Sequence, residues 1–217
     1  MRVAVLRGLT LVTATAFAMT ACSNPSPSVP PSLSAPGSSA TADASGPARS
    51  LPARWWLWAA STPAQSNPVT DTTGKWCSSM QPDDLWFLAG TFGQGTVTRH
   101  CAIPAGRKVY LPVLNQVCQM SANEPSVSGA ARCSVPVDEA LATLDGKSLP
   151  TREATSGGVF SMTSVPGSPV FDGVDKPSVA WGIWIGPVTI PNGTHVLHVR
   201  GRSGSFTVDV TYDVTVS

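Results

Sequence analysis

The stretch FTVDVTYDVTV, residues 206–216, decides the fold of this chain. Apolar and polar residues alternate along it without a break, and successive side chains of a β-strand point to opposite faces of the sheet. The pattern therefore predicts a strand with one buried and one solvated face. We expect the buried face to hold Phe206, Val208, Val210, Tyr212, Val214 and Val216.

Shorter apolar and β-branched runs, separated by Gly and Pro, predict further strands upstream. They span residues 85–92, 96–103, 108–115, 141–144, 179–185 and 195–200. Pro112 lacks a backbone N–H, so the third run is expected to be an edge strand or to carry a bulge. Asp145-Gly146 predicts a type I′ hairpin turn, although residues 137–142 could instead form a helical turn. Seven or eight short strands with frequent turns predict an all-β fold, a β-sandwich.

Residues 51–60 predict one short helix ahead of the strands. Ser50 can cap its N-terminus, Pro52 suits its first turn and Pro63 ends it. Trp55 and Trp58 are three residues apart, so they share one face of this helix. The expected domain is therefore a β-sandwich that begins with a short helix.

The N-terminus has the pattern of a bacterial export signal. Arg2 and Arg7 precede a short apolar run over residues 9–19, which is too short to span a membrane. The tetrad MTAC, residues 19–22, resembles a lipobox, in which small residues precede a cysteine that becomes lipidated. That resemblance implies a signal peptide over residues 1–21 and a lipid on Cys22 that anchors the exported chain to the bacterial cell membrane.

Residues 22–50 are rich in Ser, Pro, Ala and Gly and cannot bury enough apolar area to fold. They predict a tether with a maximum reach of about 90 Å, and residues 51–217 form the domain. Without Arg2 and Arg7 the mature chain has 12 basic and 13 acidic side chains. Such a balance provides no basic field, so we expect no nucleic-acid partner.

Four cysteines remain once Cys22 is assigned to lipid: Cys77, Cys101, Cys118 and Cys133. An even number in an oxidising compartment predicts two disulfides. Three pairings are possible, and we favour Cys77–Cys101 with Cys118–Cys133 because both close short loops. The spacings contain no C-x2-C pair, which disfavours a zinc site and leaves no metal or cofactor expected.

Several motifs resemble a family of exported bacterial proteins whose activity is uncharacterised. They are WWLW (55–58), DTTG (71–74), WFLAGT (86–91), RHCAIPAG (99–106), PVLN (112–115) with Cys118, DGK (145–147), GTH (193–195) and VTY (210–212). The likeness covers most of residues 54–216 but is weak over residues 119–178. It implies a shared domain with shared disulfides and no particular activity.

Known catalytic motifs do not occur in the sequence. A GxSxG elbow and a P-loop are both missing, and nothing marks a carboxylate pair for glycoside hydrolysis. His195 and His198 lie three apart in a strand, so they point to opposite faces and cannot share a metal without a bulge. The turn at residues 172–175, with Asp83 and Asp84 elsewhere, could supply calcium ligands, but aspartates also favour turns for local reasons.

Seven tryptophans are the strongest functional indication. If Trp181 faces the core with Ile183 and Ile185, Trp184 points to the opposite face, where it could stack on a sugar or anchor a protein. The alternative is that the N-terminal helix covers Trp184. Trp56, in the first tryptophan cluster, is a second candidate binding residue.

The sequence therefore favours a non-enzymatic binding or scaffolding module at the cell envelope, held to the membrane by the lipid on Cys22. The alternatives are a secreted hydrolase of cell-wall glycan and a docking domain for another secreted protein. In each case the expected partner is a cell-wall glycan or a secreted protein.

Overall fold

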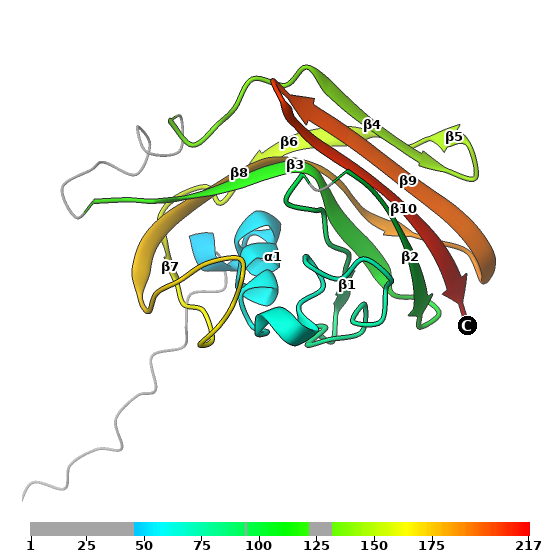
Figure 1. Ribbon diagram of the computed structural model, residues 1–217, viewed down its shortest axis with the longest axis horizontal. Coiled ribbons are helices and arrows are strands. Elements are labelled where there is room, and N and C mark those ends of the chain that lie inside the picture. The colour runs from blue at the N-terminus through cyan, green and yellow to red at the C-terminus, as the bar shows by residue number, and fades with distance from the viewer. Residues whose placement is uncertain (1–45, 94, 122–131) are drawn as a thin grey trace, which may run out of the picture. The chain divides into compact units, whose positions relative to one another are not determined.

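The computed structural model describes residues 46–93, 95–121 and 132–217. These residues form two mixed sheets, one short N-terminal α-helix and two 3-10 helices, which confirms the predicted mostly-β, two-sheet fold (Figure 1). The strands are β1 (Leu85–Phe87), β2 (Thr96–Ile103), β3 (Lys108–Gln119), β4 (Glu139–Leu144), β5 (Lys147–Ser148), β6 (Thr151–Thr155), β7 (Phe160–Met162), β8 (Lys176–Thr189), β9 (Gly193–Ser203) and β10 (Phe206–Val216). The helices are η1 (Pro47–Arg49), α1 (Leu51–Ala59) and η2 (Ala64–Ser66).

The first sheet has the strand order β1-β3-β8-β6, with β7 also paired to β8, and the second has the order β2-β10-β9-β4-β5. Most pairs are antiparallel, but β1 runs parallel to β3 and β2 runs parallel to β10. An apolar core that includes Leu111, Ile185, Leu197 and Val210 joins the two sheets. The described residues therefore form a sandwich with one core between its sheets.

β10 is the strand that its alternating sequence predicts. It pairs with β9 over its whole length and with β2 over eight residues, and its valines and Tyr212 are buried. Phe206 differs from the prediction because it is 39% exposed. It follows the turn at Gly204 and is the first residue of the strand, so its ring lies beyond the end of the core.

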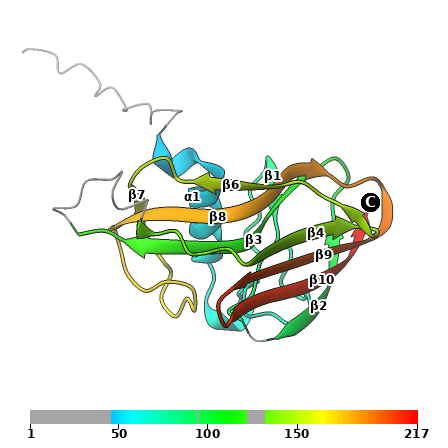
Figure 2. The ribbon, with the colours of Figure 1, turned by 90° about the horizontal axis from the view of Figure 1, so that it is seen from above.

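Both faces of the first sheet are covered, in contrast to the second sheet, whose outer face is solvated. One face packs into the core between the sheets, and the other packs against α1 through Tyr110, Ala180 and Trp184. Figure 2 shows α1 crossing the strands β3 and β8. The first sheet is thus the middle layer of three.

The helix α1 forms as predicted. Ser50 accepts a hydrogen bond from the backbone N–H of Ala53 at 3.3 Å, and a proline occupies the first turn. Trp55 and Trp58 are buried, and the indole N–H of Trp55 donates to the carbonyl of Leu88 at 2.8 Å. Aromatic contacts from this face reach Phe87 and Trp184, so α1 is fixed to the first sheet by rings.

Several boundaries differ from the sequence prediction. β1 ends at Phe87 rather than continuing to residue 92, and β3 continues past residue 115 to Gln119. The register of β3 against β8 shifts on either side of Pro112, which confirms the predicted bulge. Residues 139–144 are a strand and not a helical turn, and positive φ angles at Asp145 and Gly146 fit the predicted type I′ hairpin.

The predicted signal peptide, Cys22 and most of the tether lie outside the described residues. The last part of the segment assigned to the tether forms η1, which packs beside α1 and β7, so ordered structure begins before Leu51. No helix within the described ranges is long and apolar enough to cross a membrane.

Two disulfides join Cys77 to Cys101 and Cys118 to Cys133, the pairing that the sequence favours. They indicate an oxidising, extracytoplasmic compartment. The first bond ties the irregular segment after α1 to β2. Beside it, the N–H of His100 donates to the carbonyl of Thr73 at 2.9 Å on the free edge of β2. Gly74 makes this approach possible, since it has φ +91° and a Cβ there would lie 2.4 Å from the His100 oxygen.

Arg99 of β2 is 1% exposed and holds the same segment from inside. Its guanidinium donates five hydrogen bonds of 2.6 to 3.2 Å, one for each N–H that it carries. The acceptors are the carbonyls of Val69, Asp71, Ala89 and Gly90 and the hydroxyl of Tyr212. Burial raises the pKa of Tyr212, so its hydroxyl stays protonated and donates in turn to Ala89.

We predict that Arg99→Lys lowers the free energy of unfolding by about 3 kcal/mol, because an ammonium cannot reach all five acceptors and each buried carbonyl left without a donor costs about 1–3 kcal/mol. Urea unfolding of the two proteins measures the difference. Arg200→Lys is the matched control: Arg200 is exposed and pairs with Glu139 at 3.5 Å, so its replacement should change stability by less than about 0.5 kcal/mol. Equal stability of Arg99→Lys and the native chain would contradict the role assigned to Arg99.

Candidate functional site

A groove of about 370 Å³ opens between α1, the C-terminal half of β3 and the turn that joins β9 to β10. A smaller recess of about 60 Å³ shares five of its lining residues and extends it toward the loop after β1. We call the two together the aromatic groove. The shared residues are Trp56, Phe92, Asn115, Val170 and Phe206.

Three aromatic side chains from distant parts of the chain meet here. Trp56 comes from α1 and is buried except for 8% of its surface, whereas Phe92 and Phe206 are 41% and 39% exposed. The ring of Phe206 lies against Gly93, where a Cβ would be 3.0 Å from the ring atoms. Gly93 has φ +80°, so both its conformation and the close ring favour glycine. The loop after β1 thereby brings Phe92 beside Phe206.

Two side chains that line both the groove and the recess carry buried N–H groups without an acceptor. These atoms are Nε1 of Trp56 and Nδ2 of Asn115. A buried donor without a partner costs about 1–3 kcal/mol, and native proteins contain few of them. The recess has room for a small oxygen-bearing group, because about 10–15 Å³ of such space already holds one water molecule. The groove therefore favours a ligand that presents hydrogen-bond acceptors.

The described side chains that line the aromatic groove are all uncharged. Besides the three rings they are valines, Leu114, Trp55 and a few neutral polar groups, namely Thr91, Asn115, Gln116 and Ser203. They include no carboxylate, histidine or cysteine that could act as a general acid or nucleophile. The lining is therefore mostly apolar, with a few neutral hydrogen-bonding groups.

Trp184 does point away from the core between the sheets, as its spacing predicts, but it is not exposed. It is 2% exposed because α1 covers that face of the first sheet. Its ring stacks on Tyr110 with centroids 5.0 Å apart, and its N–H donates to the carbonyl of Ala154 at 3.2 Å. The predicted exposed binding role of Trp184 is therefore wrong, and the alternative of a helix-covered tryptophan is correct.

A second cavity, of about 330 Å³, lies beside Ser50 and Pro52. Arg152 and Glu153 are the charged residues that line it within the described part of the chain. The carboxylate of Glu153 accepts the indole N–H of Trp181 at 2.6 Å. A hydrolase of the glycosidase type needs two facing carboxylates, so neither this cavity nor the aromatic groove supports that alternative.

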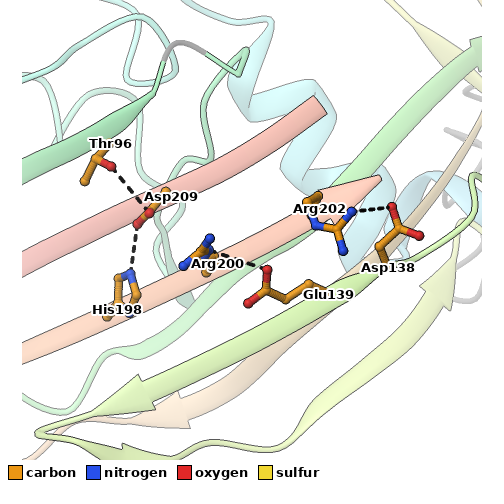
Figure 3. Close-up of polar contacts among 7 residues, drawn as sticks. All are labelled: Thr96, Asp138, Glu139, His198, Arg200, Arg202 and Asp209. Atoms are coloured by element: carbon orange, nitrogen blue, oxygen red, sulfur yellow. Dashed lines mark hydrogen bonds and ion pairs between the residues drawn. The ribbon is translucent and has the colours of Figure 1, made fainter. Parts of the chain in front are cut away.

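The outer face of the second sheet carries a row of paired charges (Figure 3). Asp209 accepts from His198 at 2.9 Å and from Thr96 at 3.4 Å. Farther along the same face, Arg200 pairs with Glu139, and Arg202 pairs with Asp138. Exposed pairs of this kind contribute about 0–1 kcal/mol each. Both arginines drawn in Figure 3 thus have a carboxylate partner, and the Asp209 carboxylate is hydrogen-bonded to two side chains.

The remaining candidate residues do not converge on a site. His195 binds the carboxylate of Asp145 at 2.8 Å, which raises the pKa of the imidazole, while His198 binds Asp209. Asp175 accepts hydrogen bonds from the hydroxyls of Ser161 and Thr163. The described residues contain no group of three or more His, Cys, Asp or Glu side chains that could hold a metal ion.

Comparisons of the chain with protein-family models, with curated proteins and with solved structures found no match. The resemblance to exported bacterial proteins therefore stays a prediction. The aromatic groove is assigned on its geometry and chemistry alone.

Of the groove residues, sequence reasoning identified only Trp56. The sequence places Phe92, Phe206 and Asn115 in predicted strands, and Asn115 also ends the PVLN motif, but nothing in it marks them as binding residues. The one local signal in the sequence is the group of glycines at positions 90, 93 and 95, which is typical of a turn but does not show what the turn faces.

We predict that Trp184→Ala lowers the free energy of unfolding by about 3–5 kcal/mol, because it removes a buried ring from the layer between α1 and the first sheet. Phe206→Ala should cost about 1 kcal/mol or less, since much of its ring is already in water. Urea denaturation of both variants measures the contrast. A Trp184→Ala protein as stable as Phe206→Ala would show that α1 does not cover this face.

Proposed function

We propose that this protein is a lipid-anchored binding module of the bacterial cell envelope that holds an uncharged ligand in the aromatic groove. The observation that carries the proposal is the pair of unpartnered donors, Trp56 Nε1 and Asn115 Nδ2, on side chains of a groove without charge. A preformed, mostly apolar cleft with a few polar groups is the usual form of a ligand site.

Two independent features support the proposed location of the module. Two disulfides indicate an oxidising compartment outside the cytoplasm. The MTAC sequence at residues 19–22 resembles a lipobox and supports a lipid on Cys22, followed by a Ser/Pro-rich tether. A tether of this composition would let the domain move relative to its anchor point on the membrane.

Binding is favoured over hydrolysis because of the side chains that line the groove. Hydroxyl and amide groups are present, but the described lining contains no base to activate a hydroxyl and no carboxylate pair to act on a glycan. The exposed rings of Phe92 and Phe206 instead give a ligand apolar surface to cover.

The anchor predicts that the native chain is in the membrane fraction and that Cys22→Ala releases it to the soluble extracytoplasmic fraction. Fractionation followed by mass spectrometry of the N-terminal peptide measures both the location and the lipid. Cys133→Ala, which removes a different cysteine, should leave the anchor in place. An unmodified Cys22 in a membrane-free native chain would refute the anchor.

The groove predicts that lipid-free chain carrying Cys22→Ala is retained by isolated bacterial cell envelopes, and that a further Phe206→Ala weakens retention at least tenfold. The lost ring corresponds to about 1.4 kcal/mol or more of binding free energy. Retention is measured by sedimentation of the envelopes over a range of protein concentrations.

Leu141→Ala is the matched control for this experiment. Leu141 is 55% exposed on the outer face of the second sheet, away from the groove, so its removal should leave retention unchanged. If Leu141→Ala weakened retention as much as Phe206→Ala, or if Phe206→Ala did not weaken it, the aromatic groove would not be the site of envelope binding.

A further inference from the structure

We propose that the ligand of the aromatic groove is an extended, proline-rich peptide segment, supplied by the tether of a second copy of this chain. The inference rests on the proposed function, because it names the occupant of the same groove. It is argued from the donors, the rings, the charge and one segment of the sequence.

The unpartnered groups of the groove match the backbone of a proline-rich peptide. Both Trp56 Nε1 and Asn115 Nδ2 are donors. Proline has no backbone N–H, and a polyproline II helix makes no internal hydrogen bonds, so such a peptide offers carbonyl acceptors with few competing donors. A glycan hydroxyl donates as well as accepts, and the described lining provides only a few neutral polar side chains to satisfy a row of hydroxyls.

The rings provide the second part of the match. Trp56, Phe92 and Phe206 lie around one groove. Proline-rich segments dock in aromatic-lined grooves because their rings pack on aromatic faces and because the polyproline II conformation is largely formed before binding. The groove thus combines apolar surface with two side chains whose N–H groups have no acceptor.

The chain itself contains one segment with this chemistry. Residues 25–36 include Pro25, Pro27, Pro30, Pro31 and Pro36. No charged residue occurs from residue 23 to residue 42, which suits a groove that is also uncharged. Pro27 and Pro30 are three residues apart in the sequence, and a polyproline II helix has three residues per turn, so prolines with this spacing would share one side of such a helix.

The tether is long enough for its proline-rich segment to reach the aromatic groove of a second copy. Pro36 and Gly46, the first described residue, are ten positions apart, so the chain between them spans up to about 31 Å when extended. Lipid anchors at Cys22 would confine the copies to one surface and raise their effective concentration. The proposed contact would join neighbouring domains through their tethers.

The experiment uses mature chain with Cys22→Ala and with the five prolines of residues 25–36 replaced by alanine, so that its own segment does not compete. The probe is a synthetic peptide of residues 24–36, with blocked ends. Binding is followed by the indole N–H signals in NMR spectra and by tryptophan fluorescence. We expect saturable binding with Kd below about 1 mM and a shift of the Trp56 indole signal as its N–H gains an acceptor.

Variants of the groove test where the peptide binds. Phe206→Ala should weaken binding at least tenfold, and Trp56→Phe, which removes the N–H but keeps a ring, should weaken it about tenfold. Leu141→Ala should leave the Kd unchanged, and a peptide with alanine at every proline should not bind. A folded protein that fails to bind the proline peptide, or that binds it equally well after Phe206→Ala, would overturn the inference.

Sedimentation of the chain with its native tether tests the source of the segment. We expect association that grows with concentration, is lost when the tether prolines are replaced, and is lost with Phe206→Ala. A chain that stays monomeric, or whose native tether blocks the added peptide without association, would refute a second copy as the source. Failure of the peptide alongside Phe206-dependent retention by envelopes would refute this inference and leave the proposed function standing.

Discussion

The structure depends most on one buried cation. Arg99 lies on β2, yet four of its five hydrogen bonds go to carbonyls at residues 69, 71, 89 and 90, in a region with little regular structure. Those carbonyls lie outside the β-ladders, and each one buried without a donor would cost about 1–3 kcal/mol. The guanidinium donates to all four carbonyls from one side chain, and the Tyr212 hydroxyl gives Ala89 a second donor. The Cys77–Cys101 bond fixes the same region at a further point. The loop that carries Phe92 begins directly after the carbonyls of Ala89 and Gly90, which Arg99 binds. Arg99 therefore helps to fix the position of this wall of the groove.

The three-layer arrangement explains why the groove forms where it does. Because α1 covers the outer face of the first sheet, its tryptophans are used mainly for packing, and Trp55 and Trp58 both donate their N–H groups to backbone carbonyls. Trp56 is one residue out of phase with that face. It therefore lies at the border of the helix, where β3 continues past the covered region and the β9–β10 turn approaches. At this border the packed elements form the walls of the groove, but core side chains do not fill it.

Local patterns predicted the local structure well. The limits of β2 and β10, the cap of α1, the bulge at Pro112, the hairpin at Asp145 and the disulfide pairing all follow from nearest-neighbour rules and are confirmed. The candidate site was harder to predict, because its residues are brought together by tertiary contacts. The periodicity of a helix or a strand in the sequence does not report such contacts. Alternation gave the correct side of the sheet for Trp184 but could not tell that a helix covers it. Likewise it placed Phe206 among the buried valines, although the strand extends past the core at that point.

The contact between the Thr73–Gly74 turn and β2 has a consequence for how the protein behaves in a crowded envelope. β2 is the edge of its sheet, and an edge strand of eight residues is a template on which another extended chain can add. The turn occupies the middle of that edge and takes up the N–H of His100. Only a residue without a side chain fits there, since a Cβ at position 74 would meet the His100 backbone. Gly74 thus helps to protect the edge at β2 from edge-to-edge aggregation. A larger residue at this position would displace the Thr73–Gly74 turn from β2 and expose the backbone N–H of His100.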